Sequence, residues 1–207
     1  MQQPGGLRER KKRQTARAIG AAAIRLFTEH TYDGVSIEQI AAAANVSKMT
    51  VFNYFPTKEN LLRGPLQWPS DGPARAVRER PAGVGSLTAL RRHVLAAIAE
   101  RDVMVGMSDD PQALAVCRLV LGTPALSHLV SLVDRPAEEA LTAALAEDLP
   151  EPVNRIVAGQ FTGTLRALRH ENLRRLLAGE PPDAVEHDAV THTHLGFDIL
   201  EHGLTAR

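Results

Sequence analysis

The sequence contains little of what marks secreted or membrane proteins. One cysteine, Cys117, occurs in 207 residues, so an internal disulfide is impossible and a reducing compartment is the simpler expectation. No apolar run reaches the roughly 18 residues of a membrane span, and no apolar segment follows the basic N-terminus. We therefore expect a cytoplasmic protein with no membrane partner and no secretory signal.

Catalytic motifs are also absent. The sequence has no nucleophile elbow, no phosphate-binding loop, no His-Glu-x-x-His run and no paired cysteines. An enzyme is one functional class to consider, and these absences argue against it. We also expect no cofactor. No segment shows sustained strand alternation between hairpin turns, so the expected fold class is all-α.

Charge is unevenly distributed along the chain. The formal net charge is zero, yet residues 1–63 hold ten of the 24 basic and five of the 24 acidic residues. The first part therefore carries +5 and the remainder −5. This division indicates that the N-terminal part is the one that contacts phosphate.

Helical periodicity covers most of the chain. Residues 64–85 are dense in proline and glycine and predict a loop-rich junction between two domains, 1–63 and 64–207. We expect one long helix at 8–29 and three short helices before the junction. Beyond it, we expect helices at 86–103, 111–121, 123–133, 135–147, 152–178 and 183–205.

The segment Ser36–Phe55 has the pattern of two helices joined by a tight turn. Ser36, with a glutamine three residues on, forms a capping box, and Ser47 can cap the next helix. Asn45 lies where the chain reverses, and asparagine tolerates the left-handed conformation of such turns. Val51 and Phe55 form the core side of the second helix. This arrangement is typical of a helix-turn-helix.

The other side of that second helix is suited to DNA. The positions left on or near its exposed side are Lys48, Met49, Thr50, Phe52, Asn53 and Tyr54. Lys48 can reach guanine or phosphate, and Asn53 can pair with both hydrogen-bonding groups of adenine. Thr50 can touch a thymine methyl group or a phosphate, and the Tyr54 hydroxyl can donate to phosphate.

Further contacts to the DNA backbone are expected from Lys58 and from the helix N-termini capped by Ser36 and Ser47. The partner is then a double-stranded DNA operator. The simpler alternative is an ordinary helical bundle with a solvated polar face.

The run Ala21–Leu62, and within it Tyr32–Ala41, Asn45–Phe55 and Pro56–Leu62, resembles the DNA-binding domain of TetR/AcrR-type regulators. The resemblance implies a three-helix head and an all-α ligand-binding body that dimerises through its last two helices. It carries the family's DNA contacts over to Lys48, Thr50, Phe52, Asn53, Tyr54 and Lys58.

Two positions depart from the family pattern. Phe52 stands where tyrosine is usual, so the phosphate contact of that hydroxyl is lost or becomes apolar. Met49 stands where a small residue is frequent, so its bulk contacts a base or limits the approach to DNA.

The last two expected helices carry stripes of small residues that suit close helix pairing. One stripe is Gly159, Gly163 and Ala167, and the other is Ala189, Thr193, Gly196, Leu200 and Gly203. Apolar edges lie beside them at Val157, Phe161, Leu165, Leu168 and Leu176, and at Val190, Phe197 and Leu204. We expect a homodimer through these helices. The alternative is that the stripes pack only against helices of the same chain.

The terminal helix is rich in histidine. His194, Asp198 and His202 are spaced by four and share one face, a spacing that metal ligands also use. Such helices are more often solvated, so we assign no metal site.

The sequence offers only candidates for an effector pocket. The apolar residues that could line an adaptable cavity are Met104, Met107, Cys117, Leu121 and Phe161. Arg118 or His128 could orient a polar or anionic group of the ligand. Each of these is also compatible with an ordinary core or surface position. The expected function is a ligand-responsive repressor with a small-molecule effector of unknown identity. An activator or an effector-independent DNA-binding protein is the alternative.

Overall fold

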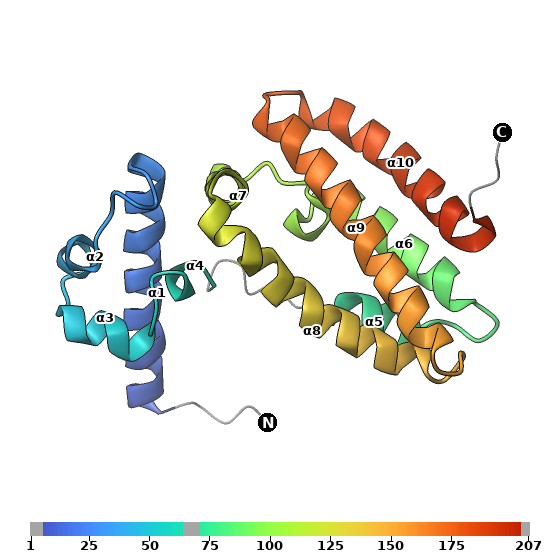
Figure 1. Ribbon diagram of the computed structural model, residues 1–207, viewed down its shortest axis with the longest axis horizontal. Helices are drawn as coiled ribbons and strands as arrows, with labels where there is room; N and C mark the ends of the chain where they lie inside the picture. Colours follow the sequence, from blue (N-terminus) through green and yellow to red (C-terminus); the bar gives the residue numbers. More distant parts are fainter. Residues whose placement is uncertain (1–5, 64–70, 204–207) are drawn as a thin grey trace. The chain divides into compact units, whose positions relative to one another are not determined.

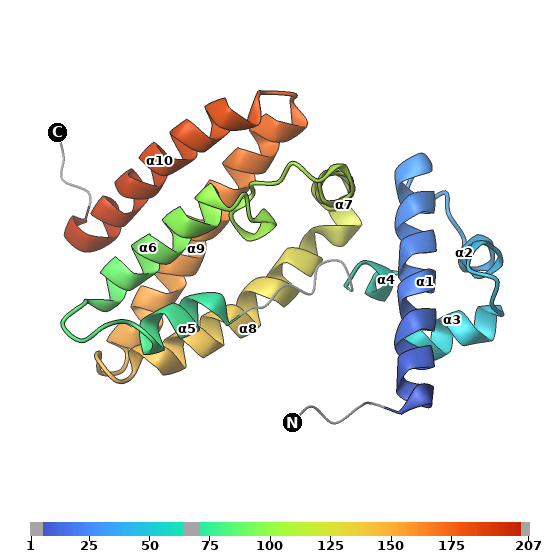
Figure 2. The same cartoon turned by 180° about the vertical axis from the view of Figure 1, so that it is seen from behind.

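The computed structural model describes residues 6–63 and 71–203, with the side chains of residues 7, 8, 63, 125 and 127–133 left undescribed. Every regular element in those ranges is a helix, which confirms the all-α fold class (Figures 1 and 2). The elements are α1 (Leu7–Glu29), α2 (Ile37–Ala43), α3 (Lys48–Tyr54), α4 (Asn60–Arg63), α5 (Gly72–Arg78), α6 (Ser86–Ala99), η1 (Val103–Val105), α7 (Pro111–Gly122), η2 (Pro124–Leu126), α8 (Ser127–Leu145), α9 (Val153–Leu177) and α10 (Pro182–His202), where η marks a 3₁₀ turn.

The chain divides into two compact units. The first comprises Met1–Gln67 and Ala115–Leu129, and the second comprises Trp68–Leu114 and Val130–Arg207. The functional boundary expected between residues 63 and 64 stays a prediction, and residues 64–70 of the expected junction lie outside the described ranges.

In the first unit, α1 packs against α2 and α4, and α2 packs against α3. Apolar side chains from all four helices are fully buried, among them Ile19, Phe27, Ile40, Val51 and Leu61. Because α2, α3 and α4 have two turns or fewer, this shared core rather than their own hydrogen bonds keeps them helical.

The turn chemistry expected from the sequence is present. Ser36 and Gln39 form a reciprocal capping box at the start of α2. Ser47 Oγ accepts a hydrogen bond from the Thr50 amide at 3.0 Å and caps α3. Asn45 takes the left-handed conformation, with φ of 53°, where the chain reverses. These local signals explain why the helix-turn-helix was readable from sequence.

The second unit is a bundle with one continuous apolar core. In this unit α6 packs against α5 and α10, α9 packs against α10, and η1 packs against α6 and α9. The views in Figures 1 and 2 agree that α9 and α10 run side by side. The Phe161 and Phe197 rings meet edge to face, with their centroids 6.1 Å apart, and fix that pairing at its centre.

Two expectations about this part of the chain were wrong. A helix, α5, forms within the expected loop-rich junction, because Pro73 lies in its first turn, where proline is tolerated, and Ala74 and Val77 are buried. Helix α8 runs without a break through Pro136, where two helices had been expected. Leu141 and Leu145 are fully buried in the same core, and we attribute the survival of α8 around an interior proline to this packing.

Helix α6 is shorter than expected. It ends at Ala99 rather than at residue 103 because Arg101 adopts a left-handed conformation, with φ of 52°. Asp102 then accepts a hydrogen bond from the Met104 amide at 2.8 Å and starts η1.

A buried hydroxyl on α10 gives a test of this packing. Thr193 is fully buried, and its Oγ1 has no hydrogen-bond partner in the described part of the chain. Because an unsatisfied buried hydroxyl is destabilising, T193V should raise the free energy of unfolding by about 1 kcal/mol. Urea unfolding at fixed protein concentration measures this change.

The matched control is T191V, because Thr191 is exposed and bonds the His187 carbonyl. Its effect should stay within about 0.5 kcal/mol. A lower unfolding midpoint for T193V than for the unsubstituted protein would contradict the assignment.

Candidate DNA interface and effector cavity

Helix α3 is held from one side only. Val51 is fully buried under it, Ser47 caps its N-terminus, and the Phe55 amide closes its last turn onto the Val51 carbonyl. The expected recognition residues occupy the remaining surface. Lys48, Met49, Phe52 and Asn53 are exposed, and Thr50 and Tyr54 are half-buried.

The two unusual positions of α3 are both at the surface. Met49 is 69% exposed and Phe52 is 38% exposed. A helix that presents two large apolar side chains to water has a surface suited to burial against a partner.

Lys48 is paired in the free protein. Its ammonium group donates to the Glu38 carboxylate on α2, and it lies 5.9 Å from the centre of the Phe52 ring. The hydrogen bond from Lys48 lowers the pKa of Glu38. Both side chains are exposed, so the pair contributes little to stability, and its importance is that it places a carboxylate beside an expected DNA contact.

Lys58 is in a different environment. Its ammonium group donates to the Tyr32 carbonyl and lies 4.4 Å from the centre of the Tyr32 ring and 5.5 Å from that of Phe27. The Tyr32 hydroxyl donates to Glu59 at 3.0 Å. Burial, and then this bond to Glu59, raise the pKa of Tyr32. Lys58 thus joins the segment before α4 to Phe27 of α1 and to Tyr32 in the turn after α1, and its phosphate contact stays a prediction.

The hydroxyls of Ser36 and Ser47 are both engaged with their own helix N-termini. Any contact they make to DNA would come through the neighbouring amides. That role also stays a prediction.

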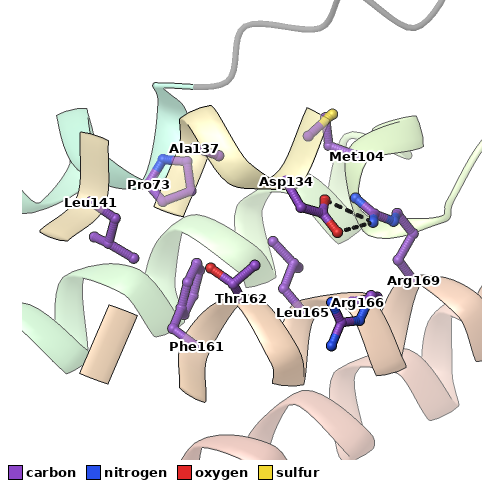
Figure 3. A pocket seen from close by; sticks show the side chains of 10 residues that line it. All are labelled: Pro73, Met104, Asp134, Ala137, Leu141, Phe161, Thr162, Leu165, Arg166 and Arg169. Carbon is purple, nitrogen blue, oxygen red and sulfur yellow. Dashed lines mark hydrogen bonds and ion pairs between the residues drawn. The ribbon is translucent and has the colours of Figure 1, made fainter. Parts of the chain in front are cut away.

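The second unit contains a small cavity, drawn in Figure 3. Its volume is about 30 Å³. Its lining comes from α5, η1, α8 and α9 and comprises Pro73, Met104, Asp134, Ala137, Leu141, Phe161, Thr162, Leu165, Arg166 and Arg169.

A buried ion pair forms part of the cavity lining. Arg169 Nη2 on α9 donates to both carboxylate oxygens of Asp134 on α8, at 2.9 and 3.1 Å. The two residues are 8% and 9% exposed. Figure 3 shows the pair facing the same space as the Phe161 and Leu165 side chains.

The structure brings only part of the expected pocket together. Met104 and Phe161 line the cavity, whereas Met107 is fully buried in the core of the same unit. Cys117 is buried, and Arg118 and Leu121 are exposed, on a segment assigned to the first unit. The His128 side chain lies outside the described residues.

Sequence analysis missed the ion pair. Asp134 and Arg169 are 35 residues apart on different helices, so their pairing leaves no local trace. One signal was available: Arg169 follows Phe161 and Leu165 at steps of four, which places a charge on an apolar helix face.

The expected dimer stripes divide between two faces. Phe161, Ala189, Thr193 and Phe197 are buried within the chain, as the alternative of internal packing requires. A Cβ added to Gly196 would lie 2.9 Å from Thr164, so this glycine also serves the pairing of α9 with α10.

Other residues of the same two helices face solvent. A Cβ at Gly163 would meet nothing within 4 Å, and Ala167 is exposed. The exposed large apolar side chains on these helices are Val153 and Ile156 on α9 and Leu195 and Ile199 on α10. Leu204 lies outside the described residues.

The histidine-rich face of α10 has other contacts. Asp198 pairs with Arg91 at 2.8 Å, and His202 Nδ1 lies 3.2 Å from the Asp198 carbonyl. Among the described residues, no three His, Cys, Asp or Glu side chains group to hold a metal ion. No helix in the described ranges is long and apolar enough to cross a membrane.

Comparison with known proteins agrees with this geometry. Residues 19–64 match the family described as bacterial regulatory proteins, tetR family. The regulator TcmR of Streptomyces glaucescens is 35% identical over 124 residues, which are 58% of this chain and 54% of that protein. The regulator RutR of Escherichia coli O157:H7 is 32% identical over 139 residues, or 62% of this chain and 61% of RutR. Both alignments therefore span less than two thirds of the relatives.

Solved structures extend the likeness of fold over the whole chain. NalD of Pseudomonas aeruginosa, described as the secondary repressor of a multidrug efflux pump, has a TM-score of 0.62 and 20% identity, over 89% of this chain and 97% of NalD. A TetR-family regulator of Streptomyces coelicolor has a TM-score of 0.58 and 21% identity, over 97% and 99% of the two chains.

TcmR and this RutR are both described as HTH-type transcriptional regulators. Residues 19–64, which contain the helix-turn-helix of the first unit, form a DNA-binding domain of the tetR family of bacterial regulatory proteins.

Proposed function

We propose that the chain is a ligand-responsive transcriptional repressor that works in the cytoplasm. It binds a palindromic operator as a dimer and is released by a small-molecule effector. The observation that carries the proposal is the surface of α3, which is anchored by Val51 and presents Lys48, Met49, Phe52 and Asn53 to solvent.

Two structural neighbours support the repressor and effector parts. NalD is described as a repressor. SmeT, whose fold matches with a TM-score of 0.60 and 19% identity over 90% of each chain, has been crystallised with triclosan. For this chain the effector is proposed to enter the cavity between α5, α8 and α9, and it shifts DNA binding only by its differential affinity for the two states.

A dimer fits the operator geometry. Two-fold symmetry would place the two α3 helices about 34–36 Å apart, one turn of DNA, on a palindromic site. The exposed apolar side chains on α9 and α10 are the surface we assign to the partner copy.

Base readout is tested by selecting bound sequences from random double-stranded DNA. The selection should give a palindrome. N53A should relax the preference at one base pair of each half-site at a cost of roughly 1–3 kcal/mol, because Asn53 is assigned to a base edge. K58A should weaken all sequences about equally, with thermal unfolding measured alongside because Lys58 also binds Tyr32. An unchanged preference in N53A would refute the assignment.

The Lys48–Glu38 pair gives a second test. E38Q removes a negative charge beside the DNA-facing surface and frees Lys48, so operator affinity at low salt should rise roughly two- to fivefold. The gain should shrink as salt is added. Fluorescence anisotropy on the selected operator measures it.

E29Q is the matched control for E38Q. It makes the same change of charge at the last residue of α1, whereas Lys48 pairs with Glu38, and it should leave affinity within about twofold. Equal gains in affinity from E38Q and E29Q would show that only the net charge matters, and would contradict a specific role for the Lys48–Glu38 pair.

The dimer surface is tested by placing a charge at its centre. L195E and I156E should each shift the protein from dimer to monomer in sedimentation at roughly micromolar concentration, because a buried unpaired carboxylate is costly. L121E makes the same change at an exposed leucine on α7 and should leave the dimer intact. A monomeric unsubstituted protein, or a dimeric L195E, would overturn the assignment.

A further inference from the structure

The cavity is too small for an organic ligand as it stands. Its volume of about 30 Å³ has room for about one water molecule, whereas ligand pockets usually measure about 300–1,000 Å³. A ligand must therefore displace side chains that line it. The question is which contact opens.

The Asp134–Arg169 pair is the polar contact that joins α8 to α9 across this lining. Both of its hydrogen bonds come from a single nitrogen, Nη2, rather than from two nitrogens in a fork. Nε and Nη1 of Arg169 make no bond to Asp134. A guanidinium has five N–H donors, so Arg169 can also donate to a second anion.

The charges of the lining favour an anion. Arg166 and Arg169 contribute two positive charges and Asp134 one negative charge, so the lining carries +1. The Arg166 side chain is exposed and follows Leu165, which is also in the lining. An entering carboxylate or sulfonate would meet a net attraction, whereas an entering cation would be repelled.

Arg169 is the more firmly held member of the pair. Asn172 on the same helix donates to the Val105 carbonyl at 2.8 Å, which fastens η1 onto α9. Gly106 lies so close that a Cβ added there would be 2.3 Å from the Arg169 carbonyl oxygen. Movement of Arg169 would disturb these contacts. Movement of Asp134 would break its two hydrogen bonds to Arg169.

Apart from Arg166 and Thr162, the rest of the lining is apolar. The apolar lining residues include Met104, Leu141, Phe161 and Leu165, and in Figure 3 Phe161 lies between Leu141 and the ion pair. A ligand that fits both parts has an apolar, preferably aromatic, body and one acidic group at its end.

We propose that the cavity binds an amphipathic organic anion whose acidic group replaces Asp134 as the partner of Arg169. The inference rests on the proposed effector function and names the chemical class of the effector. Binding would break the Asp134–Arg169 link between α8 and α9, while the core packing of Leu141 and the bond from Asn154 to the Thr142 carbonyl hold the rest of α8 in place. The Asp134 carboxylate would then move towards water.

The test uses two fluorescent probes with the same aromatic core. 8-Anilinonaphthalene-1-sulfonate carries one sulfonate, and N-phenyl-1-naphthylamine carries none. The 207-residue chain should bind the sulfonate one to one and at least about tenfold more tightly than the neutral probe, because a buried guanidinium favours a negatively charged ligand. Fluorescence titration with a fixed protein concentration gives both affinities.

Variants locate the site. D134N removes the competing carboxylate and should tighten sulfonate binding several-fold. The double variant D134N/R169M keeps the lining free of an unpaired buried charge and should abolish the preference for sulfonate while the neutral probe still binds. E139Q, an exposed charge change on α8 outside the lining, should leave both affinities unchanged.

Equal affinity for the two probes would overturn the proposal. So would a preference for sulfonate that survives in D134N/R169M, or several equivalent sites that ignore both variants. Operator binding, measured in parallel, separates this inference from the repressor function. If the sulfonate probe binds at Arg169 but the protein stays on the operator, the anion site is supported and release by this anion is contradicted. If another compound releases the operator while neither probe binds, the anion site is wrong and the repressor function is supported.

Discussion

The buried face of α9 is the constraint on which the second unit depends. Phe161 packs edge to face on Phe197 of α10, and Asn172 fastens η1 through the Val105 carbonyl. Arg169 binds α8 through Asp134 on the same face. One helix therefore contacts three neighbours, and its contact with α8 combines apolar packing around Leu141 with this ion pair. A polar solute cannot take the place of packed apolar side chains. An anion can take the place of Asp134 as the partner of Arg169, so the ion pair is the contact that a ligand can replace.

The first unit depends on packing in a simpler way. Its recognition helix has seven residues and would not stay helical alone. Val51 attaches it to the core shared with α1, α2 and α4, and the Ser47 cap satisfies its first turn. Because one side is entirely committed to support, the opposite side is free to carry side chains chosen for a partner. Lys58, which rests on the rings of Tyr32 and Phe27, belongs to the support as well as to the expected interface.

The parts of the fold that follow from short-range chemistry were predictable. The caps at Ser36 and Ser47 and the left-handed Asn45 depend on neighbours within four residues, and all three are present. Helix α5 and the continuity of α8 through Pro136 depend on burial against distant helices, which outweighs local proline and glycine signals. The same reason explains the site. The face of α3 follows from periodicity, but the partners of Lys48, Lys58 and Arg169 are 10, 26 and 35 residues away.

Gly106 shows how a position outside the cavity lining constrains it. Its φ of 76° is costly for most other residues, and any side chain there would collide with the backbone of Arg169. Among natural or laboratory variants, the lining residues themselves can change to suit a new compound, as methionine and leucine readily do. Position 106 has no such latitude, because every replacement moves the helix that carries the arginine. A change of ligand preference in this protein is therefore expected from substitutions of the side chains around Arg169, while the backbone at Gly106 and Arg169 stays the same.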